Sequence, residues 1–243
     1  DIDKALMINS SFERTLEFWA SLTSLGRIDP SSFLHKLPHI SFVRGELDVS
    51  FLAKRFNILR SFKAFSSMEW SEDHGKISSW MPLIMEGRNS NEKLAATKIE
   101  RGTDVDFGVL TSTYINELLQ KDVVDIKFSS EVVDLFKDGK NEWKLMLSSE
   151  DREFEVVSPF VFLGAGGGVL PLLQKSRIPE SLKFGGFPVS GQWLVCSNKQ
   201  LINQHFGKVY GKAKVGAPPM SLPHLDSRWI KGEKSLIFGP FAG

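Results

Sequence analysis

Residues 160–168 read FVFLGAGGG, and this stretch decides the fold class. Its first four residues are continuously apolar, which is typical of a strand buried on both faces of a sheet. Glycines follow this strand at once, and the sequence after them favours a helix. A buried strand that is followed by glycines and then by a helix is the connection typical of an α/β protein, and we therefore predict that class.

The glycine cluster at 164–168 offers bare backbone N–H groups and a helix N-terminus, which can accept a pyrophosphate. A full dinucleotide fingerprint also needs a small residue at position 169 and an acidic residue about 20 positions further on. Position 169 is Val, and the later region reads FGGFP at 184–188. The cluster is therefore not the opening βαβ unit of a nucleotide domain. Two interpretations stay open: a tight strand-to-helix turn, or a later contact to a dinucleotide whose main phosphate loop lies elsewhere.

Apolar periodicity places further elements around this stretch. The predicted helices are 8–19, one that Asp48 caps, one that begins at Ser71, and 106–119. The predicted strands are 38–44, 126–128 continuing into 132–136, 143–147, 154–156 and 192–196, with a turn at 138–141 and a hairpin around 231–234. Strands 126–156 are consecutive, and we expect them to form a meander.

The composition excludes several classes of protein. With 243 residues, 42% hydrophobic and 24% charged, and a formal net charge of +1, the chain is neither disordered nor a typical nucleic-acid binder. From this near-neutral charge we expect no nucleic acid as a partner. The single cysteine excludes an internal disulfide and a thiolate-rich metal site, and we expect no metal. No apolar run approaches the roughly 18 residues of a membrane span. Because the chain lacks an initiator Met and stops at FGPFAG, we expect a segment of a longer protein.

Short strings spread along the chain carry a resemblance to a known family. They are PHISFV (38–43), SEDH (71–74), MEGR (85–88), GTDVD (102–106), GAGGG (164–168), GFPVSGQ (186–192), KVYGK (208–212), VGAPPM (215–220), PHLDSR (223–228) and FGPF (238–241). With the order of helix, meander and Gly-Ala-Gly strand end, the chain resembles the glycine oxidase and D-amino-acid oxidase superfamily of flavoproteins. Within that superfamily it is similar to the malate:quinone oxidoreductases.

The resemblance implies a partial FAD/NAD(P)-binding, Rossmann-like fold with a β-meander, joined to an α+β substrate-binding domain with a mixed or antiparallel sheet. Residues 1–33 and 101–178 would belong to the FAD-binding domain, and residues 34–100 and 179–243 to the substrate-binding domain. The family's opening βαβ unit would precede residue 1, and a further FAD-contacting part would follow residue 243. The residues implied to contact FAD are Val132, through its backbone, and Gly164, Ala165, Gly166 and Gly167.

The resemblance also implies an activity: oxidation of L-malate to oxaloacetate in the tricarboxylic acid cycle, with electrons passed from FAD to a membrane quinone. The enzyme would be cytoplasmic and peripheral to the inner face of the cell membrane. The helix after Asp48 carries basic residues around an apolar face and could lie in the interface, although such a helix usually packs on its own core. Two alternatives stay open: another FAD-dependent 2-hydroxy-acid or amine oxidoreductase that uses oxygen, and a segment that is inactive and serves as a non-catalytic module.

Malate oxidation needs a base for the hydroxyl proton and cations for two carboxylates. We rank His224 first as the base and His39 second, with a hydrogen-bonded structural histidine as the alternative for His224. Arg228 is the first candidate cation. In a regular strand His224 and Arg228 share a face but lie about 13 Å apart, so Arg228 reaches back, a bulge bends the strand, or one of the two is structural.

Reserve substrate contacts complete the predicted site. They are Gln192, Arg101 and Lys98. An exposed salt bridge is the alternative for Arg101 and Lys98. Related 2-hydroxy-acid dehydrogenases carry a His-x-Thr-Arg arrangement where this chain has HLDSR at 224–228.

Overall fold

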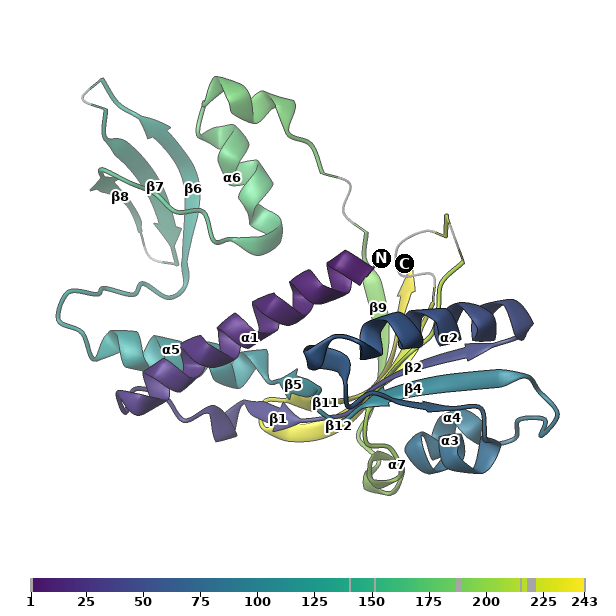
Figure 1. The fold of residues 1–243 in the computed structure, drawn as a ribbon. Helices are drawn as coiled ribbons and strands as arrows, with labels where there is room; N and C mark the ends of the chain where they lie inside the picture. Colours follow the sequence, from purple (N-terminus) through teal and green to yellow (C-terminus); the bar gives the residue numbers. More distant parts are fainter. Residues whose placement is uncertain are drawn as a thin grey trace. The chain divides into compact units, whose positions relative to one another are not determined.

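The computed structural model describes residues 2–139, 141–150, 152–186, 189–214, 216–217 and 222–242. The chain divides into two compact units, one formed by Asp1–Lys121 with Val189–Gly243 and the other by Asp122–Pro188. Helices and sheets are mixed in the chain (Figure 1), which confirms the predicted α/β class. The assignment of residue ranges to an FAD domain and a substrate domain stays a prediction.

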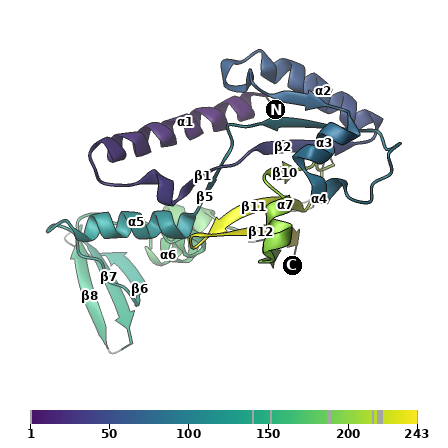
Figure 2. The ribbon, with the colours of Figure 1, turned by 90° about the horizontal axis from the view of Figure 1, so that it is seen from below.

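The first unit is built on a seven-stranded mixed sheet with strand order β3-β4-β2-β10-β11-β12-β9. The strands are β2 (His39–Arg44), β3 (Glu69–Ser71), β4 (Leu94–Ile99), β9 (Gly191–Cys196), β10 (Lys208–Tyr210), β11 (His224–Ile230) and β12 (Glu233–Ala242). Only the β10–β2 pair among these described neighbours is parallel. Two further strands, β1 (Leu34–Lys36) and β5 (Thr103–Val105), pair with each other as an antiparallel ribbon (Figure 2).

Helix α2 (Glu46–Arg60) packs on one face of this sheet, and α3 (His74–Trp80) and α4 (Pro82–Met85) pack on the other. The other described α-helices of this unit are α1 (Ile2–Ser24), α5 (Phe107–Leu119) and α7 (Lys199–Gln204). The predicted helices 8–19 and 106–119 are confirmed by α1 and α5, and Asp106 caps α5 by accepting from the Gly108 and Val109 N–H groups. No helix among the described residues has both the length and the apolar character needed to cross a bilayer.

Two predicted helix starts were wrong. Gly45, with φ 84°, occupies the N-cap position of α2, and Asp48 lies in the first turn, where it pairs with Lys212. Ser71 ends β3, because this segment pairs with β4 and stays extended. The cap of α3 is Asp73, which accepts from the Lys76 N–H. For α3, the pairing of Ser71 with β4 thus left Asp73 as the cap.

The main core lies on the α3 and α4 side of the sheet. Its strand residues point to one face because side chains alternate along a strand. The buried cluster consists of Ile40, Phe42, Leu94, Ala96 and Val209 from the strands, with Ile77, Trp80, Met81 and Met85 from the helices. On the opposite face, α2 packs Val49 and Leu52 against Val43 and Ala95. A separate cluster joins Trp19 of α1 to Phe33 and to Leu110 of α5.

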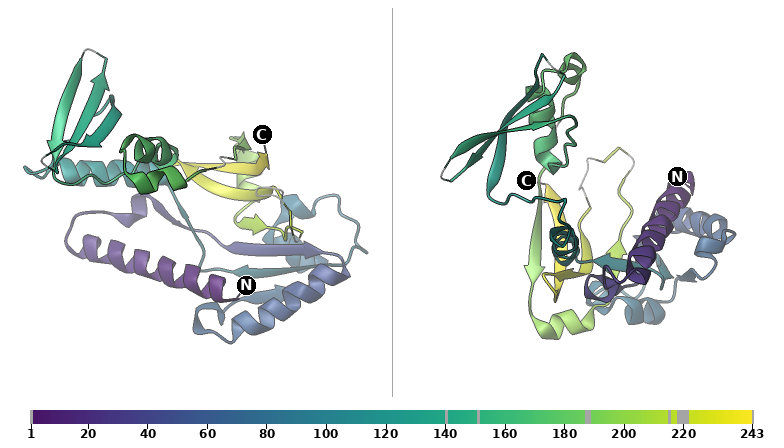
Figure 3. Two further views of the ribbon diagram at one scale, coloured as in Figure 1. Left: turned by 90° about the horizontal axis from the view of Figure 1, so that it is seen from above. Right: turned by 90° about the vertical axis from the view of Figure 1, so that its left-hand side faces the viewer.

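The second unit is a three-stranded antiparallel meander with one short helix (Figure 3). Its strands are β6 (Ser130–Lys137), β7 (Trp143–Ser149) and β8 (Glu153–Ser158), and its helix is α6 (Val169–Lys175). The meander was predicted and is confirmed, although residues 126–128 lie before β6 and form no strand. Lys140 of the predicted turn at 138–141 lies outside the described residues.

The strand predicted at 160–163 is wrong. These residues have no regular structure, and the side chains of Phe160 and Phe162 are 73% and 83% exposed. An apolar run becomes a strand only where another backbone pairs with it, and no described segment pairs with this one. The following glycines form a 3₁₀ turn at Gly166–Gly168 and lead into α6, so the predicted helix is present.

Candidate active site

The predicted catalytic residues of β11 lie on one face of the seven-stranded sheet, opposite the α3 and α4 core. The β11–β12 register runs without interruption from His224, opposite Gly239, to Ile230, opposite Glu233. The strand is therefore regular, which excludes a bulge between His224 and Arg228. The two residues have different partners, because His224 contacts Asp226 while Arg228 contacts Asp104.

His224 belongs to a histidine–carboxylate pair. Its Nδ1 lies 2.9 Å from Oδ2 of Asp226, and the Tyr210 hydroxyl donates to the same oxygen at 3.3 Å. The Tyr210 ring lies beside the His224 ring at a centroid distance of 4.2 Å, and the Trp193 ring meets it edge-on at 5.0 Å. A carboxylate on Nδ1 fixes the orientation of an imidazole and leaves Nε2 to exchange a proton with a ligand.

The pKa values of the two acidic partners follow from their burial. Burial raises the pKa of the Asp226 carboxyl above its ordinary value, and His224, Lys208 and Tyr210 act against this rise. Burial and the neighbouring Asp226 raise the pKa of the Tyr210 phenol, so this hydroxyl stays protonated at neutral pH. Tyr210 can therefore act as a hydrogen-bond donor to Asp226 but not as a base.

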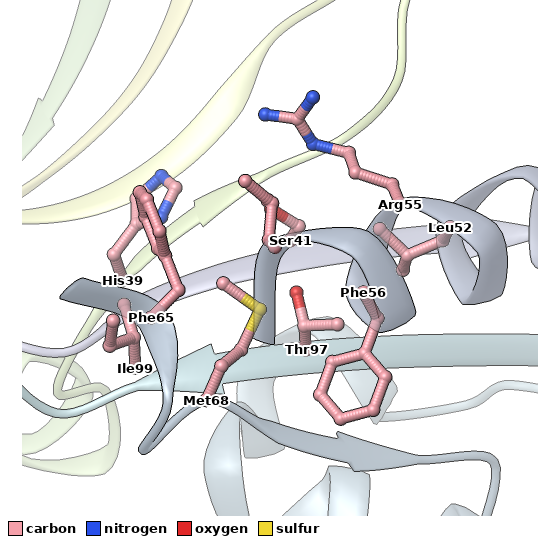
Figure 4. Close-up of a pocket in the computed structure, with 10 residues that line it drawn as sticks. His39, Ser41, Leu52, Arg55, Phe56, Phe65, Met68, Thr97 and Ile99 are labelled. Atoms are coloured by element: carbon pink, nitrogen blue, oxygen red, sulfur yellow. The ribbon is translucent and has the colours of Figure 1, made fainter. Parts of the chain in front are cut away.

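His39 lies on β2, in register with Lys208 of the parallel neighbour β10, and its ring is 5.0 Å from that of Tyr210. His39 is exposed and lines a cavity with Ser41, Arg55 and Phe65 (Figure 4). Desolvation by the surrounding side chains, followed by the charges of Lys208 and Arg55, lowers the pKa of His39 from 6.5 to about 4. His39 is therefore neutral at neutral pH and a weaker base than an ordinary histidine.

Arg228 is held by a buried carboxylate that the sequence prediction missed. Asp104, which is 1% exposed, has Oδ1 at 2.7 Å from Lys208 Nζ and at 3.0 Å from Arg228 Nε. Its Oδ2 accepts from the Trp229 N–H at 2.8 Å. A missed signal is the alternation along KVYGK, which could have put Lys208 and Tyr210 on one face. No local pattern indicated that Asp104 would meet them.

A larger cavity of about 570 Å³ opens beside His39, between α1 and the sheet. Its described lining is mostly apolar and includes the cationic residues Lys4, Arg55, Arg101 and Lys208, with Glu13 as the one acidic residue. An excess of positive charge on concave, low-dielectric walls attracts anions. The structure thus brings together two predicted residues, His39 and Arg101, at a cavity suited to an anionic ligand.

Two predicted substrate contacts lie elsewhere. Lys98 pairs in register with Ile40 and therefore belongs to the α3 and α4 face, where it forms an ion pair with Glu100 and lies over the Trp80 ring. Gln192 is exposed on β9, the edge strand, which is separated from β11 by β12. The placement of Lys98 agrees with the salt-bridge alternative, and its role in binding substrate stays a prediction without structural support.

The residues expected to contact FAD lie in the second unit. Val132 is half-buried on β6, opposite Leu147, and the register shifts directly after it. Gly164, Ala165, Gly166 and Gly167 form an exposed segment before α6. The strings GFPVSGQ and VGAPPM include Phe187–Pro188, Val215 and 218–220, which lie outside the described residues.

Comparison with known proteins identifies the family. The sequence model described as malate:quinone oxidoreductase (Mqo) matches residues 1–243. A probable malate:quinone oxidoreductase from Prochlorococcus marinus (strain MIT 9211) is 59% identical over 243 residues, which cover 100% of this chain and 49% of the relative. Another, from Synechococcus sp. (strain RCC307), is 56% identical over 240 residues, which cover 99% of this chain and 50% of the relative.

Solved structures support the fold. L-Proline dehydrogenase from P. horikoshii matches with a TM-score of 0.61 and 11% identity, over 95% of this chain and 54% of that chain. Dithionite-reduced L-α-glycerophosphate oxidase from Mycoplasma pneumoniae with FAD bound matches with a TM-score of 0.58 and 16% identity, over 87% of this chain and 50% of that chain. The chain spans about half the length of the curated relatives it matches. Because the family model matches every residue, the chain belongs to the malate:quinone oxidoreductase family.

Proposed function

We propose that the protein containing this chain oxidises (S)-malate to oxaloacetate with FAD and passes the electrons to a membrane quinone. The observation that carries this proposal is the family match over residues 1–243. The site has suitable chemistry, because a histidine–carboxylate pair lies on the sheet face that also borders a cation-lined cavity. A 2-hydroxy acid needs both features: a base at its hydroxyl and cations at its carboxylates.

The glycine segment fits a dinucleotide. Gly166 has φ 53°, a left-handed conformation that favours glycine. Gly167 lies outside the left-handed region, and a Cβ there would meet no described atom within 4 Å. Packing within the described chain therefore does not explain Gly167, whereas close passage of a pyrophosphate would. We assign the FAD contacts to Gly164, Ala165, Gly166 and Gly167, with the Val132 backbone. When bound, FAD supplies the acceptor for the hydride that leaves C2 of malate.

His224 is the proposed base. Its Nε2 takes the proton of the malate hydroxyl, while Asp226 on Nδ1 holds the ring and stabilises the imidazolium that forms. General base catalysis of this kind contributes about a hundredfold to ten-thousandfold in rate. His39 is the second candidate, and its pKa of about 4 makes it the weaker proton acceptor. Arg228 and Arg101 supply positive charge for the carboxylates, with Gln192 in reserve.

The domain assignment extends this proposal. Residues 1–33 and 101–178 form part of an FAD-binding domain, and residues 34–100 and 179–243 form part of a substrate-binding domain. The observation in its favour is the fold-level match to oxidases and dehydrogenases over 87% and 95% of this chain.

A quinone acceptor requires contact with a membrane, and we place the protein peripherally on the inner face of the cell membrane. The outer face of α2 supports this placement. Leu47, Phe51 and Ile58 are 87%, 46% and 50% exposed, and their spacing of four and seven residues puts them on one helix face. Lys54 and Arg60 are also exposed on this helix. An exposed apolar stripe with basic neighbours suits an anionic lipid interface.

The test uses the protein at full length, purified with FAD. Anaerobic mixing with (S)-malate should bleach the flavin absorbance, (R)-malate should not, and a soluble quinone analogue should restore it. Failure of (S)-malate to bleach the flavin would contradict the proposed substrate. Rapid oxygen consumption on malate without quinone would contradict the proposed acceptor and favour an oxidase.

A further inference from the structure

Lys208 borders both the large cavity and the sheet face that carries His224 and Asp226. It is in register with His39 on one side and with Asp226 on the other. It also lines the large cavity together with His39 and Arg101, and its side chain is 16% exposed. The charge of Lys208 also contributes, after desolvation, to the lowered pKa of His39.

The Lys208 ammonium group is fixed rather than free. Its Nζ lies 2.7 Å from Oδ1 of Asp104, a carboxylate with no exposed side-chain surface. Arg228 shares the same oxygen, and the Trp229 N–H occupies the other one. Asp104 thus holds a flexible lysine in one place at the border between the cavity and the His224 face.

The charge of this cluster changes when His224 takes up a proton. Lys208 and Arg228 share the carboxylate of Asp104, and Asp226 lies opposite Lys208 on the neighbouring strand. While His224 is neutral, these two cations and two carboxylates balance, and one positive charge is in excess once His224 has accepted a proton. That charge is then available to an anionic group of a ligand in the adjoining cavity.

We propose that Lys208 selects dicarboxylate substrates by binding the carboxylate farther from the reacting carbon, and that Asp104 is the positioning residue that holds Lys208 for this task. The inference rests on the proposed function, since it presumes that a 2-hydroxy acid reacts beside His224. A fixed cation gains energy only from a substrate with a second carboxylate. A substrate that carries a methyl group there offers the ammonium group no partner in addition to Asp104.

The test compares (S)-malate with (S)-2-hydroxybutyrate, which has a methyl group in place of the second carboxylate. Specificity constants for flavin reduction are measured in the full-length, FAD-loaded protein and in Lys208→Met and Lys208→Arg. We expect Lys208→Met to lower the malate to hydroxybutyrate ratio by about tenfold to a hundredfold, the range for a lost hydrogen bond to a charged group. Lys208→Arg should keep most of the preference, because it keeps the charge.

Lys212→Met is the matched control. Lys212 belongs to the same KVYGK string, and its Nζ also lies 2.7 Å from a carboxylate oxygen, that of Asp48. This variant should leave the ratio unchanged. Flavin content and circular dichroism check that Lys208→Met folds, which we expect because Asp104 keeps Arg228 and the Trp229 N–H as partners.

Each outcome decides a separate question. An unchanged ratio in Lys208→Met, or an equal loss for both substrates, would overturn the role of Lys208 as a selector. Wild-type protein that is not reduced by malate would instead refute the proposed function. If hydroxybutyrate reacts too slowly to measure, the affinities for the products oxaloacetate and 2-oxobutyrate replace the specificity constants. Shifts of the flavin spectrum report both affinities. A ratio of affinities that Lys208→Met leaves unchanged would also overturn the role of Lys208.

Discussion

The two faces of the seven-stranded sheet differ although the same strands build them. On one face Ile40 and Val209 contribute to a buried apolar core with α3 and α4. On the other, the adjacent residues His39 and Lys208 belong to a cluster of charged and aromatic side chains. Alternation along each strand thus separates the residues that stabilise the fold from those that meet a ligand. Replacements on the two faces should therefore have different consequences.

The largest effect is expected on the polar face. His224→Gln should slow flavin reduction by malate about a hundredfold to ten-thousandfold, because it removes the proposed base. Stability should change little, since the Gln amide can still donate to Asp226. Stopped-flow reduction and thermal melting measure the two quantities. A loss of only a few fold would reject His224 as the base, and the same measurement on His39→Gln would then test the second candidate.

Next in size is a replacement on the apolar face. Ile40→Ala should lower the free energy of unfolding by about 2–5 kcal/mol, because Ile40 is fully buried and its truncation leaves a cavity. Denaturant titration measures this, and flavin reduction by the folded protein should stay within a few fold of wild type. Leu47→Ala is the control, because Leu47 is 87% exposed and should change stability by no more than about 0.5 kcal/mol. If Ile40→Ala and Leu47→Ala lowered the free energy of unfolding equally, the assignment of Ile40 to the stabilising core would be wrong.

The smallest effect concerns the pH dependence of stability. The pKa of His39 falls from 6.5 to about 4 in the folded protein, so between these values the unfolded chain binds more protons. Stability should therefore decrease as the pH is lowered from 6.5 towards 4, and His39→Gln should weaken this dependence. His205, whose pKa burial also lowers, contributes with the same sign and should leave a residual slope. Identical slopes in wild type and variant, from denaturant titrations across this range, would show that His39 is not desolvated.

Local patterns predicted much of the fold and part of the site. Apolar periodicity was sufficient for α1 and α5, and alternation with turn residues was sufficient for the meander and for the β11–β12 hairpin. The same alternation correctly put His224 and Arg228 on one face. These elements depend on contacts between near neighbours in the sequence, which a single chain displays directly.

The remaining features depend on partners far away in the sequence. The apolar run at 160–163 looked like a buried strand, but a strand also needs a neighbour, and none is present among the described residues. Lys98 was a reserve substrate contact with a salt bridge as the alternative, and only its register with Ile40 shows that it lies on the core face. The proposed role of Asp104 in positioning Lys208 follows from the ion pair between the two residues. No local sequence pattern connects positions 104 and 208.

The string GTDVD also affects the order in which the chain can fold. Asp104 and Asp106 accept from the N–H groups of Trp229 and Gly232, which lie 125 and 126 positions further along the chain. Contacts of such separation form late, because a long loop has to close first. During synthesis, the carboxylate of Asp104 emerges well before the cations Lys208 and Arg228 that neutralise it and the Trp229 N–H that donates to it. Burial of this charge therefore has to wait for β10 and for the β11–β12 hairpin.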